Sequence, residues 1–278
     1  MKKNPLAEKL LGRQAEYPLA ESIPIMERWF KEPTGRSMLC NQQAVVDDFL
    51  QTLFGYHLLQ LSVSRDVNLV DTSRIRHKFR LSPLSGASVG AVCEEEQLPL
   101  EQDCIDLAVV HHLLDYSQNP HQTLRELSRV VIPSGHVLII GFNPVSLLGV
   151  YAASKRLSKS RVWQNHPVTV RRLVDWLTLM DFSVQKVHYG FYMPPVKWMN
   201  KSRLCRGLNR RLTQSQWPTG GFYAVLAKKE VAPLTPRRMK WQKVSSIIPQ
   251  LEPSLYQHPQ NGVKTKSGRA SVNSKSGS

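Results

Sequence analysis

The middle of the chain changes from one hydrophobic pattern to another and back, which predicts a strand, a helix and a second strand. Residues 105–110 and 136–142 are short, nearly continuous apolar runs bounded by polar residues, as in strands buried on both faces. Between them, Leu124, Leu127 and Val131 recur at helical spacing and form one apolar stripe. Such a unit places its two strands side by side and parallel, with the helix on one face of the sheet.

Further elements follow from the same two patterns on either side of this unit. Asn119 and Pro120 are suited to begin the central helix, and Ser134-Gly135 is suited to end it. Elsewhere the patterns predict helices over 41–54 and 169–180, and strands over 56–63, 79–82, 183–189 and 221–227. Ligands of parallel sheets bind beyond the carboxyl ends of the strands. Those ends lie here at His111-His112 and at Asn143.

Five short motifs in this region resemble a known family. They are Leu98-Pro99-Leu100, Asp106, the segment 112–116, Leu124-Arg125-Glu126 and Pro133-Ser134-Gly135. Their order and spacing are similar to the C-terminal half of a class I S-adenosylmethionine-dependent methyltransferase domain of the type 11 kind, and the resemblance extends over roughly residues 50–227. It implies an α/β fold, a Rossmann-like three-layer sandwich with a mostly parallel sheet of about seven strands, the last antiparallel. It also implies S-adenosylmethionine as the cofactor.

The chain departs from this family in the loop that meets the cofactor. The family has an acidic residue in the first strand and three glycines after it, because glycines let backbone N–H groups approach the ligand closely. At these positions the chain has Gln60, Ser62, Ser64 and Asp66. Ser82 stands where an acidic residue usually binds the ribose hydroxyls, and it can accept only a neutral hydrogen bond. Two interpretations remain open, a working cofactor site and a retained fold whose site is weakened or lost.

Other positions favour cofactor binding under the same resemblance. Glu94 falls where a carboxylate accepts from the adenine amino group, although residues 94–96 also suit a solvated turn. His111 is expected to line the cofactor pocket, and His112 and Asn143 to contact substrate. Two adjacent histidines of a strand point to opposite faces, so we expect no metal site there. No catalytic residue is assigned.

Charge divides the chain into an acidic part and a basic part. Residues 1–153 carry a net charge of −3, residues 154–227 carry +11 and residues 228–278 carry +8. Aromatic residues interleave with cations over 190–220, a pattern that can stack bases and bind phosphates. An inward-packed lid with solvated cations explains it equally well. Arg206, Arg210 and Arg211 are the candidate substrate contacts, and RNA or another anionic molecule is the expected partner.

Composition suggests three regions. We expect an N-terminal extension over 1–40, a methyltransferase-like domain over 41–229 with a basic-aromatic insertion at 190–220, and a disordered basic tail over 230–278. The four cysteines show no disulfide or metal spacing, and no apolar run suits a signal peptide or a membrane span, so we expect a cytoplasmic protein. The predicted function is methyl transfer from S-adenosylmethionine. The alternatives are a non-catalytic protein of this fold that binds RNA or another anion through its basic half, and an enzyme acting on a different nucleotide-like ligand.

Overall fold

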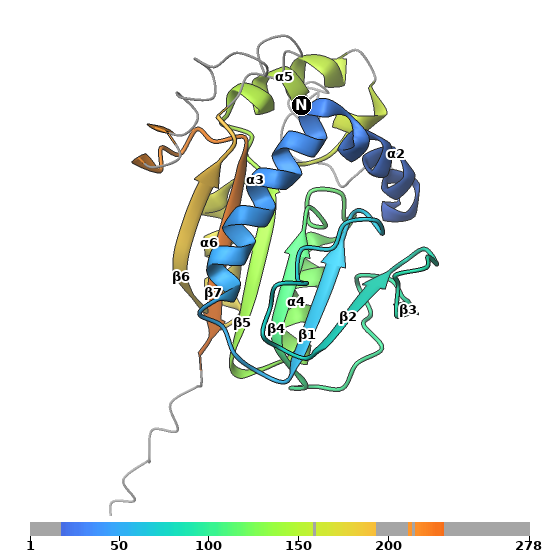
Figure 1. Cartoon of the computed structure of the whole chain (residues 1–278), viewed down its shortest axis with the longest axis vertical. Coiled ribbons are helices and arrows are strands. Elements are labelled where there is room, and N and C mark those ends of the chain that lie inside the picture. The colour runs from blue at the N-terminus through green and yellow to red at the C-terminus, as the bar shows by residue number, and fades with distance from the viewer. Residues whose placement is uncertain (1–17, 158–159, 193–210, 213–214, 231–278) are drawn as a thin grey trace, which may run out of the picture. The chain divides into compact units, whose positions relative to one another are not determined.

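A mixed sheet forms the centre of the computed structural model, which describes residues 18–157, 160–192, 211–212 and 215–230 (Figure 1). Within these residues the sheet has seven strands in the order β3-β2-β1-β4-β5-β7-β6. The strands β1 to β5 pair in parallel, and β7 lies antiparallel between β5 and β6. Their bounds are β1 His57–Ser62, β2 His77–Ser82, β3 Ala91–Val92, β4 Ile105–His111, β5 Val131–Phe142, β6 Phe182–Gly190 and β7 Phe222–Lys229.

Helices cover the sheet on both faces, so the molecule has three layers. Helix α3 lies on one face, and α4 and α6 lie on the other (Figure 1). Helices α2 and α5 lie at the end of the sheet to which the parallel strands point (Figure 1). The bounds are α2 Leu19–Lys31, α3 Pro33–Leu50, α4 Pro120–Val130, α5 Leu147–Leu157 and α6 Val170–Leu179, with a 3-10 turn, η1, at Arg161–Trp163. The predicted fold class is confirmed.

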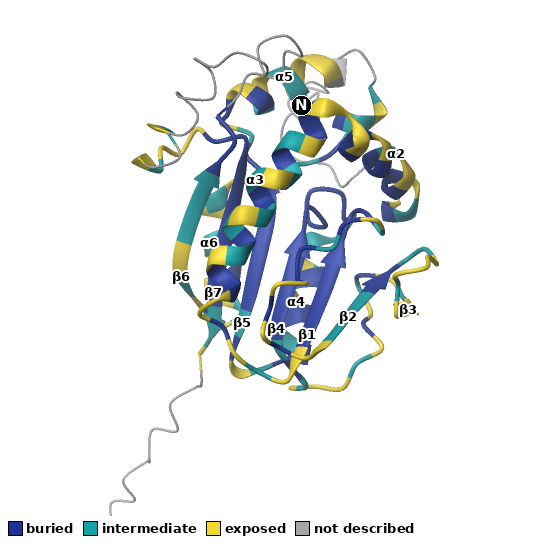
Figure 2. Ribbon diagram, in the orientation of Figure 1, coloured by how far each residue is buried: buried dark blue, intermediate teal, exposed yellow. Residues whose placement is uncertain are grey.

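The apolar runs of the sequence become the buried interior of the sheet (Figure 2). Val109 of β4 and Leu138 of β5 are both 0% exposed, and so is Leu127, which lies on the stripe of α4. The side chain of Thr169 caps α6 by accepting from the N–H of Arg172. A strand that packs against helices on both faces is apolar at nearly every position. Such a run is visible in the sequence, which explains why β4 and β5 could be predicted from it.

Three boundaries differ from the sequence-based expectation. Helix α3 begins at Pro33, whose fixed φ suits the first helical turn, and not at residue 41. Strand β5 begins at Val131, immediately after α4, because Val131 pairs with Ile105. Helix α4 ends at Val130, and not at Ser134-Gly135. The predicted division of the chain at residues 40 and 230 stays a prediction, and α3 crosses the first of these positions.

Asp106 joins the start of β1 to β4. Its Oδ2 accepts from the N–H groups of Tyr56 and His57 over 3.0 and 2.9 Å. A Cβ atom at Gly55 would lie 2.4 Å from the Cβ of Asp106, so only glycine allows this approach. The aspartate of the family-like motif therefore has a structural role at the end of the sheet opposite the candidate site.

Candidate functional site

The strand order reverses between β1 and β4, which makes the carboxyl ends of these strands the expected ligand position. Ser62, the last residue of β1, pairs with His111, the last residue of β4. Ser62 Oγ lies 2.9 Å from His111 Nδ1, and the N–H of Val63 donates to the carbonyl of His111 over 3.1 Å. The structure thus brings together two of the residues predicted to bind the cofactor.

Gln60 acts as an internal brace for the long loop after β1. Its Nε2 donates to the carbonyl of Val67 over 2.7 Å, and its Oε1 accepts from the N–H of Leu69 over 3.0 Å. Gln60 is 1% exposed. Its amide therefore provides hydrogen bonds to backbone groups of the loop that have no partner in the sheet. The predicted contact of Gln60 with a cofactor stays a prediction.

Ser64 carries the unsatisfied polar atom of this loop. Its N–H donates to Ser62 Oγ over 3.1 Å, while its own buried hydroxyl has no hydrogen-bond partner within the described residues. A buried hydroxyl without a partner is unusual, and it can still donate to a ligand. Ser82, at the end of β2, is also buried, and its Oγ accepts from the N–H of Leu84 over 3.3 Å.

His111 and His112 belong to a buried hydrogen-bond chain centred on Gln42 of α3. Gln42 Nε2 lies 2.7 Å from His112 Nε2, and Gln42 Oε1 lies 3.0 Å from His111 Nε2. On its other side His112 Nδ1 lies 2.9 Å from Asp115 Oδ2, which also accepts from the N–H of Phe142. The chain links the ends of β1, β4 and β5 to α3 through side chains that are 0–1% exposed, except for Ser62 at 5%.

Burial changes the protonation of this chain. Loss of solvation lowers the pKa of His111 far below its usual value and that of His112 to about 3. The same cause raises the pKa of Asp115. Both imidazoles are therefore neutral at physiological pH. His112 also adopts a φ of 51°, a left-handed conformation that is uncommon outside glycine and is often found at functional sites.

Helix α2 closes this edge of the sheet. The ring of Phe30 lies 5.4 Å from that of His111 and 6.0 Å from that of His112. Trp29 packs edge-on against Phe142 at 5.8 Å. Both histidines are 0% exposed as a result. Their predicted contacts with cofactor and substrate stay predictions, and in the described arrangement the two side chains face protein groups only.

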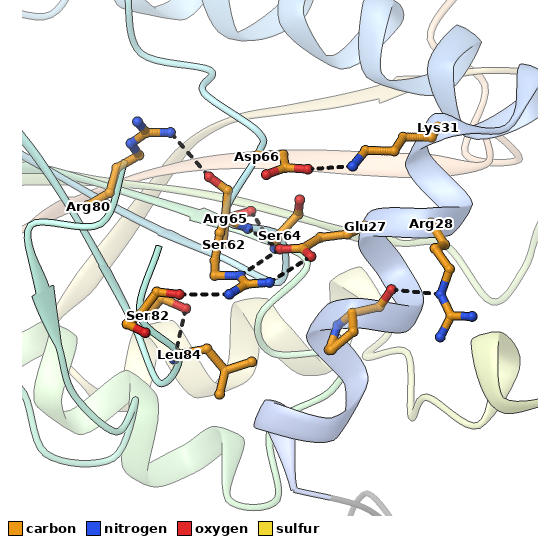
Figure 3. Close-up of polar contacts among 12 residues, drawn as sticks. Glu27, Arg28, Lys31, Ser62, Ser64, Arg65, Asp66, Arg80, Ser82 and Leu84 are labelled. Atoms are coloured by element: carbon orange, nitrogen blue, oxygen red, sulfur yellow. Dashed lines mark hydrogen bonds and ion pairs between the residues drawn. The ribbon is translucent and has the colours of Figure 1, made fainter. Parts of the chain in front are cut away.

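Two ion pairs connect α2 to the loop after β1 (Figure 3). Arg65 extends from the loop to Glu27, with Nε–Oε1 and Nη2–Oε2 distances of 2.9 and 3.0 Å. Lys31 pairs with Asp66 at 2.8 Å on the surface. The Arg65 guanidinium keeps the pKa of Glu27 below its usual value, so Glu27 is a carboxylate at neutral pH.

Sequence reasoning missed Glu27, Arg65 and Gln42, because each acts on residues distant in the chain. A signal for Gln42 was available: it lies among apolar positions of an amphipathic helix, where a glutamine needs a buried partner. Arg65 could have been noticed as a cation inside a loop aligned with a glycine-rich motif. Nothing in the sequence pairs it with Glu27.

The remaining predicted residues lie at different places. Glu94 is exposed, whereas the neighbouring Glu95 is buried, and that burial raises the pKa of Glu95. Asn143 donates to the carbonyls of Pro218 and Gly220, both over 2.9 Å, and so holds the entry to β7 against the end of β5. Arg211 is exposed, and Arg206 and Arg210 lie outside the described residues. The roles of these residues stay predictions.

Two kinds of feature are absent from the described part of the chain. It contains no group of three His, Cys, Asp or Glu side chains placed to hold a metal ion. Among its helices, none combines the length and apolar character needed to cross a bilayer.

Comparison with known proteins agrees with the fold. Residues 55–139 match the family model described as a methyltransferase domain. This segment is similar to a methyltransferase domain. It covers β1 to β4, α4 and most of β5, the part of the fold that carries Ser62 and His111 at the reversal of strand order.

Relatives of the whole chain extend this agreement. The uncharacterized protein YafS of Escherichia coli K12 is 27% identical over 225 residues, which are 80% of this chain and 89% of YafS. Among solved structures, an S-adenosylmethionine-dependent methyltransferase from Archaeoglobus fulgidus has a TM-score of 0.52 at 16% identity, covering 74% of this chain and 98% of its own. Another from Thermotoga maritima has a TM-score of 0.50 at 15% identity, covering 73% and 94%. A chain from the Haloferax volcanii complex that contains the Trm112 methyltransferase activator has a TM-score of 0.50 at 12% identity, covering 74% and 98%. These likenesses confirm the fold.

S-adenosylmethionine is the cofactor implied for this methyltransferase domain. The residues present do not fit it in the arrangement described. Three successive N–H groups of the loop after β1 already donate within the protein, those of Val63 to His111, Ser64 to Ser62 and Arg65 to Glu27. The Ser64 hydroxyl is the buried donor of this loop that remains for a ligand. The expected cofactor position is thus filled by contacts within the protein, one of which joins the loop after β1 to Glu27 of α2.

Proposed function

We propose that the chain is an S-adenosylmethionine-dependent methyltransferase that acts on an anionic substrate. One observation carries the first half of this proposal: the segment that matches the family model contains the strands whose order reverses at Ser62 and His111. That reversal is where open α/β sheets bind their ligands. Family and fold therefore both support the proposed position of the cofactor.

Charge supports the second half of the proposal. Residues 154–227 carry a net charge of +11 and include the segment that leads into β7, beside the carboxyl end of β5. Arg211 and Trp217 are exposed in this segment, Trp217 to 59%. An exposed aromatic ring in a basic segment suits stacking on a base and contact with phosphate, which favours RNA over phospholipid. The cysteines Cys40, Cys93 and Cys104 are free thiols, in keeping with a cytoplasmic location.

The second candidate function is non-catalytic binding of RNA or another anion on a methyltransferase fold. A specific observation favours it. His111 and His112 are 0% exposed, and three loop N–H groups beside them already have protein acceptors. A site that has lost its cofactor is expected to fill with internal contacts of this kind.

Calorimetric titration of the purified protein with S-adenosylmethionine and S-adenosylhomocysteine separates the two candidates. Saturable binding of both compounds, with the product the tighter or equal ligand, supports the methyltransferase. If the purified protein unfolds cooperatively but neither compound produces binding heat at millimolar concentration, the methyltransferase proposal is contradicted. The non-catalytic binding protein is then the remaining candidate.

A further inference from the structure

A pocket of about 360 Å³ lies along β2, before the carboxyl end of the strand. Its lining includes Asn68 and Asp71 of the loop after β1, Lys78 and Arg80 of β2, and the segment 87–90 that leads into β3. Lys78 lies four residues before the end of β2, which is about 13 Å along the strand. The volume suits a small molecule, because ligand pockets usually measure about 300–1,000 Å³.

The pocket forms where β2 is incompletely covered. Residues 63–76, which connect β1 to β2, form turns and bends without a helix. Over positions 78–80, β2 is therefore only half-buried, whereas β1 is buried from its second residue onward (Figure 2). Strand β3 pairs with β2 at Leu81 and Ser82, beyond the part of β2 that lines the pocket. Polar side chains thus replace apolar packing along the first half of β2.

Lys78 and Arg80 point into the same space. They lie two positions apart on one strand, so their side chains leave the same face of the sheet. Arg80 pairs in register with Gln60, whose side chain donates to the carbonyl of Val67. This face is therefore the one that the loop after β1 crosses, and both cations lie between the sheet and that loop.

These two cations have no counter-charge of their own. Lys78 Nζ donates to the carbonyl of Asp71 over 2.7 Å, and Arg80 Nη1 donates to the carbonyl of Arg65 over 3.5 Å. Within the described residues, neither side chain forms an ion pair. The rest of the Arg80 guanidinium points away from the residues drawn in Figure 3. Most N–H donors of the two side chains are therefore available to an anion, which half-buried cations favour.

The other polar groups of the lining restrict the kind of anion. Ser88 adds a hydroxyl donor, and a tetrahedral phosphate can accept from an ammonium, a guanidinium and a hydroxyl together. Asp71 is the acid of the lining, and its Oδ1 accepts from Asn68 Nδ2 over 2.6 Å. A carboxylate beside two cations repels a run of phosphates, but it leaves enough positive charge for one. The lining therefore suits a single phosphate and not the backbone of a nucleic acid.

We propose that this pocket binds a small phosphate monoester, with the phosphate held by Lys78 and Arg80. The volume of the pocket leaves room for a group the size of a sugar beside the phosphate. The inference goes beyond the proposed function and does not rest on it, because the lining contains none of the residues predicted to bind the cofactor.

The test is calorimetric titration of the full-length protein with ribose 5-phosphate in a buffer free of phosphate. We expect binding of one molecule per chain, weaker binding of inorganic phosphate and no binding of ribose. Lys78→Gln and Arg80→Gln should each weaken the binding of ribose 5-phosphate at least about tenfold, because each removes charged donors. Arg76→Gln is the matched control. Arg76 is exposed just before β2 and outside the lining, so the same loss of charge should leave the affinity within about twofold.

A variant with the opposite sign keeps the test independent of damage to the fold. Asp71→Asn preserves the acceptor for Asn68 and removes the negative charge from the lining. It should tighten the binding of ribose 5-phosphate roughly threefold, because one repulsive charge is lost in a solvated pocket. A disturbed loop would weaken binding instead, so tighter binding cannot arise from misfolding.

Several results would overturn the inference. If ribose binds as tightly as ribose 5-phosphate, phosphate is not the group that the pocket recognises. If inorganic phosphate binds more tightly, the ligand is the free ion and not a monoester. Equal losses in Arg76→Gln and Arg80→Gln would show that attraction follows the net charge of the chain and not the pocket. Absence of one-to-one binding by the wild type at millimolar concentration removes the inference, whatever the titration with S-adenosylmethionine gives.

Discussion

The Nε2 atoms of Gln42 and His112 lie 2.7 Å apart, and this contact assigns the protons of the whole buried chain. An amide NH2 group can only donate, so His112 accepts at Nε2 and carries its proton on Nδ1, facing Asp115. Gln42 Oε1 can only accept, so His111 carries its proton on Nε2 and accepts at Nδ1 from the hydroxyl of Ser62. The opposite orientation of the amide would place an unprotonated nitrogen of His112 against Asp115, and would require the Asp115 carboxyl to hold a proton and donate it to that nitrogen.

Gln42→Ala should therefore destabilise the fold. It leaves the Nε2–H of His111 and the Nε2 of His112 without partners in a dry site, and each buried group without a partner costs about 1–3 kcal/mol. We expect a loss of about 2–4 kcal/mol in the free energy of unfolding, measured by urea denaturation. Gln51→Ala is the control: Gln51 is exposed at the end of the same helix, and its substitution should change stability by less than about 0.5 kcal/mol. Equal effects of the two variants would contradict the assigned chain.

Stability should fall as the pH is lowered through the range of free histidine. Burial lowers the pKa of His111 in the folded state, so below about pH 6.5 the unfolded chain binds a proton at His111 that the folded chain does not. The contribution of His111 is thus present above this pH and is lost as the pH falls. His112, with its folded pKa of about 3, acts in the same direction.

The difference between His111→Gln and the wild type isolates this effect from other titrating groups. Between pH 6 and 5, the wild type should lose up to about 1.4 kcal/mol per pH unit more than the variant, which corresponds to one proton. Denaturant titrations at several pH values measure the two slopes. Parallel slopes would mean that His111 becomes protonated in the folded protein, and would contradict its burial.

Sequence patterns predicted the helices and strands whose own residues form a continuous apolar run or an apolar stripe. The strands around Val109 and Leu138 and the stripe of α4 are of this kind, since hydrophobic burial needs no particular partner. The contacts of Glu27 with Arg65 and of Gln42 with His112 are different, because they join side chains 38 and 70 positions apart. Only the assembled sheet brings these polar groups together, so no local pattern could have revealed that α2 closes the site.

The apolar stripe of α4 leads to a direct stability prediction. Leu127 is 0% exposed against the sheet, so Leu127→Ala should leave a cavity and reduce the free energy of unfolding by about 2–4 kcal/mol. Arg125 is exposed two residues earlier on the same helix, and Arg125→Ala should change stability by less than about 0.5 kcal/mol. Thermal and urea denaturation measure both. A small effect at Leu127 would mean that the helix does not pack on the sheet through this face.

Polyanion binding should depend steeply on salt, because neutralising several phosphates releases counterions. Residues 231–278 lie outside the described residues and contribute to the positive charge of the chain. Their affinity for a polyanion must therefore be measured separately from that of residues 1–230. A chain truncated after Glu230 provides this separation. It keeps β7 intact, since Lys229 Nζ donates to Asp103 and to the carbonyls of Ser128 and Val131, and the N–H of Glu230 donates to the carbonyl of Asp181.

We expect the truncated chain to retain RNA affinity at about 0.15 M salt, a condition of near-physiological screening. Neutralising Arg206, Arg210 and Arg211 together should then weaken binding at least tenfold and reduce the salt dependence, because up to three phosphate contacts are lost. Neutralising Arg125 and Arg171, which are exposed on α4 and α6, is the control and should leave the affinity within about twofold. Fluorescence anisotropy with a single-stranded RNA, compared with vesicles of anionic lipid, measures these changes. If truncation alone abolishes binding, the segment that contains Arg206, Arg210 and Arg211 is not the recognition surface, and residues 231–278 account for the attraction to the polyanion.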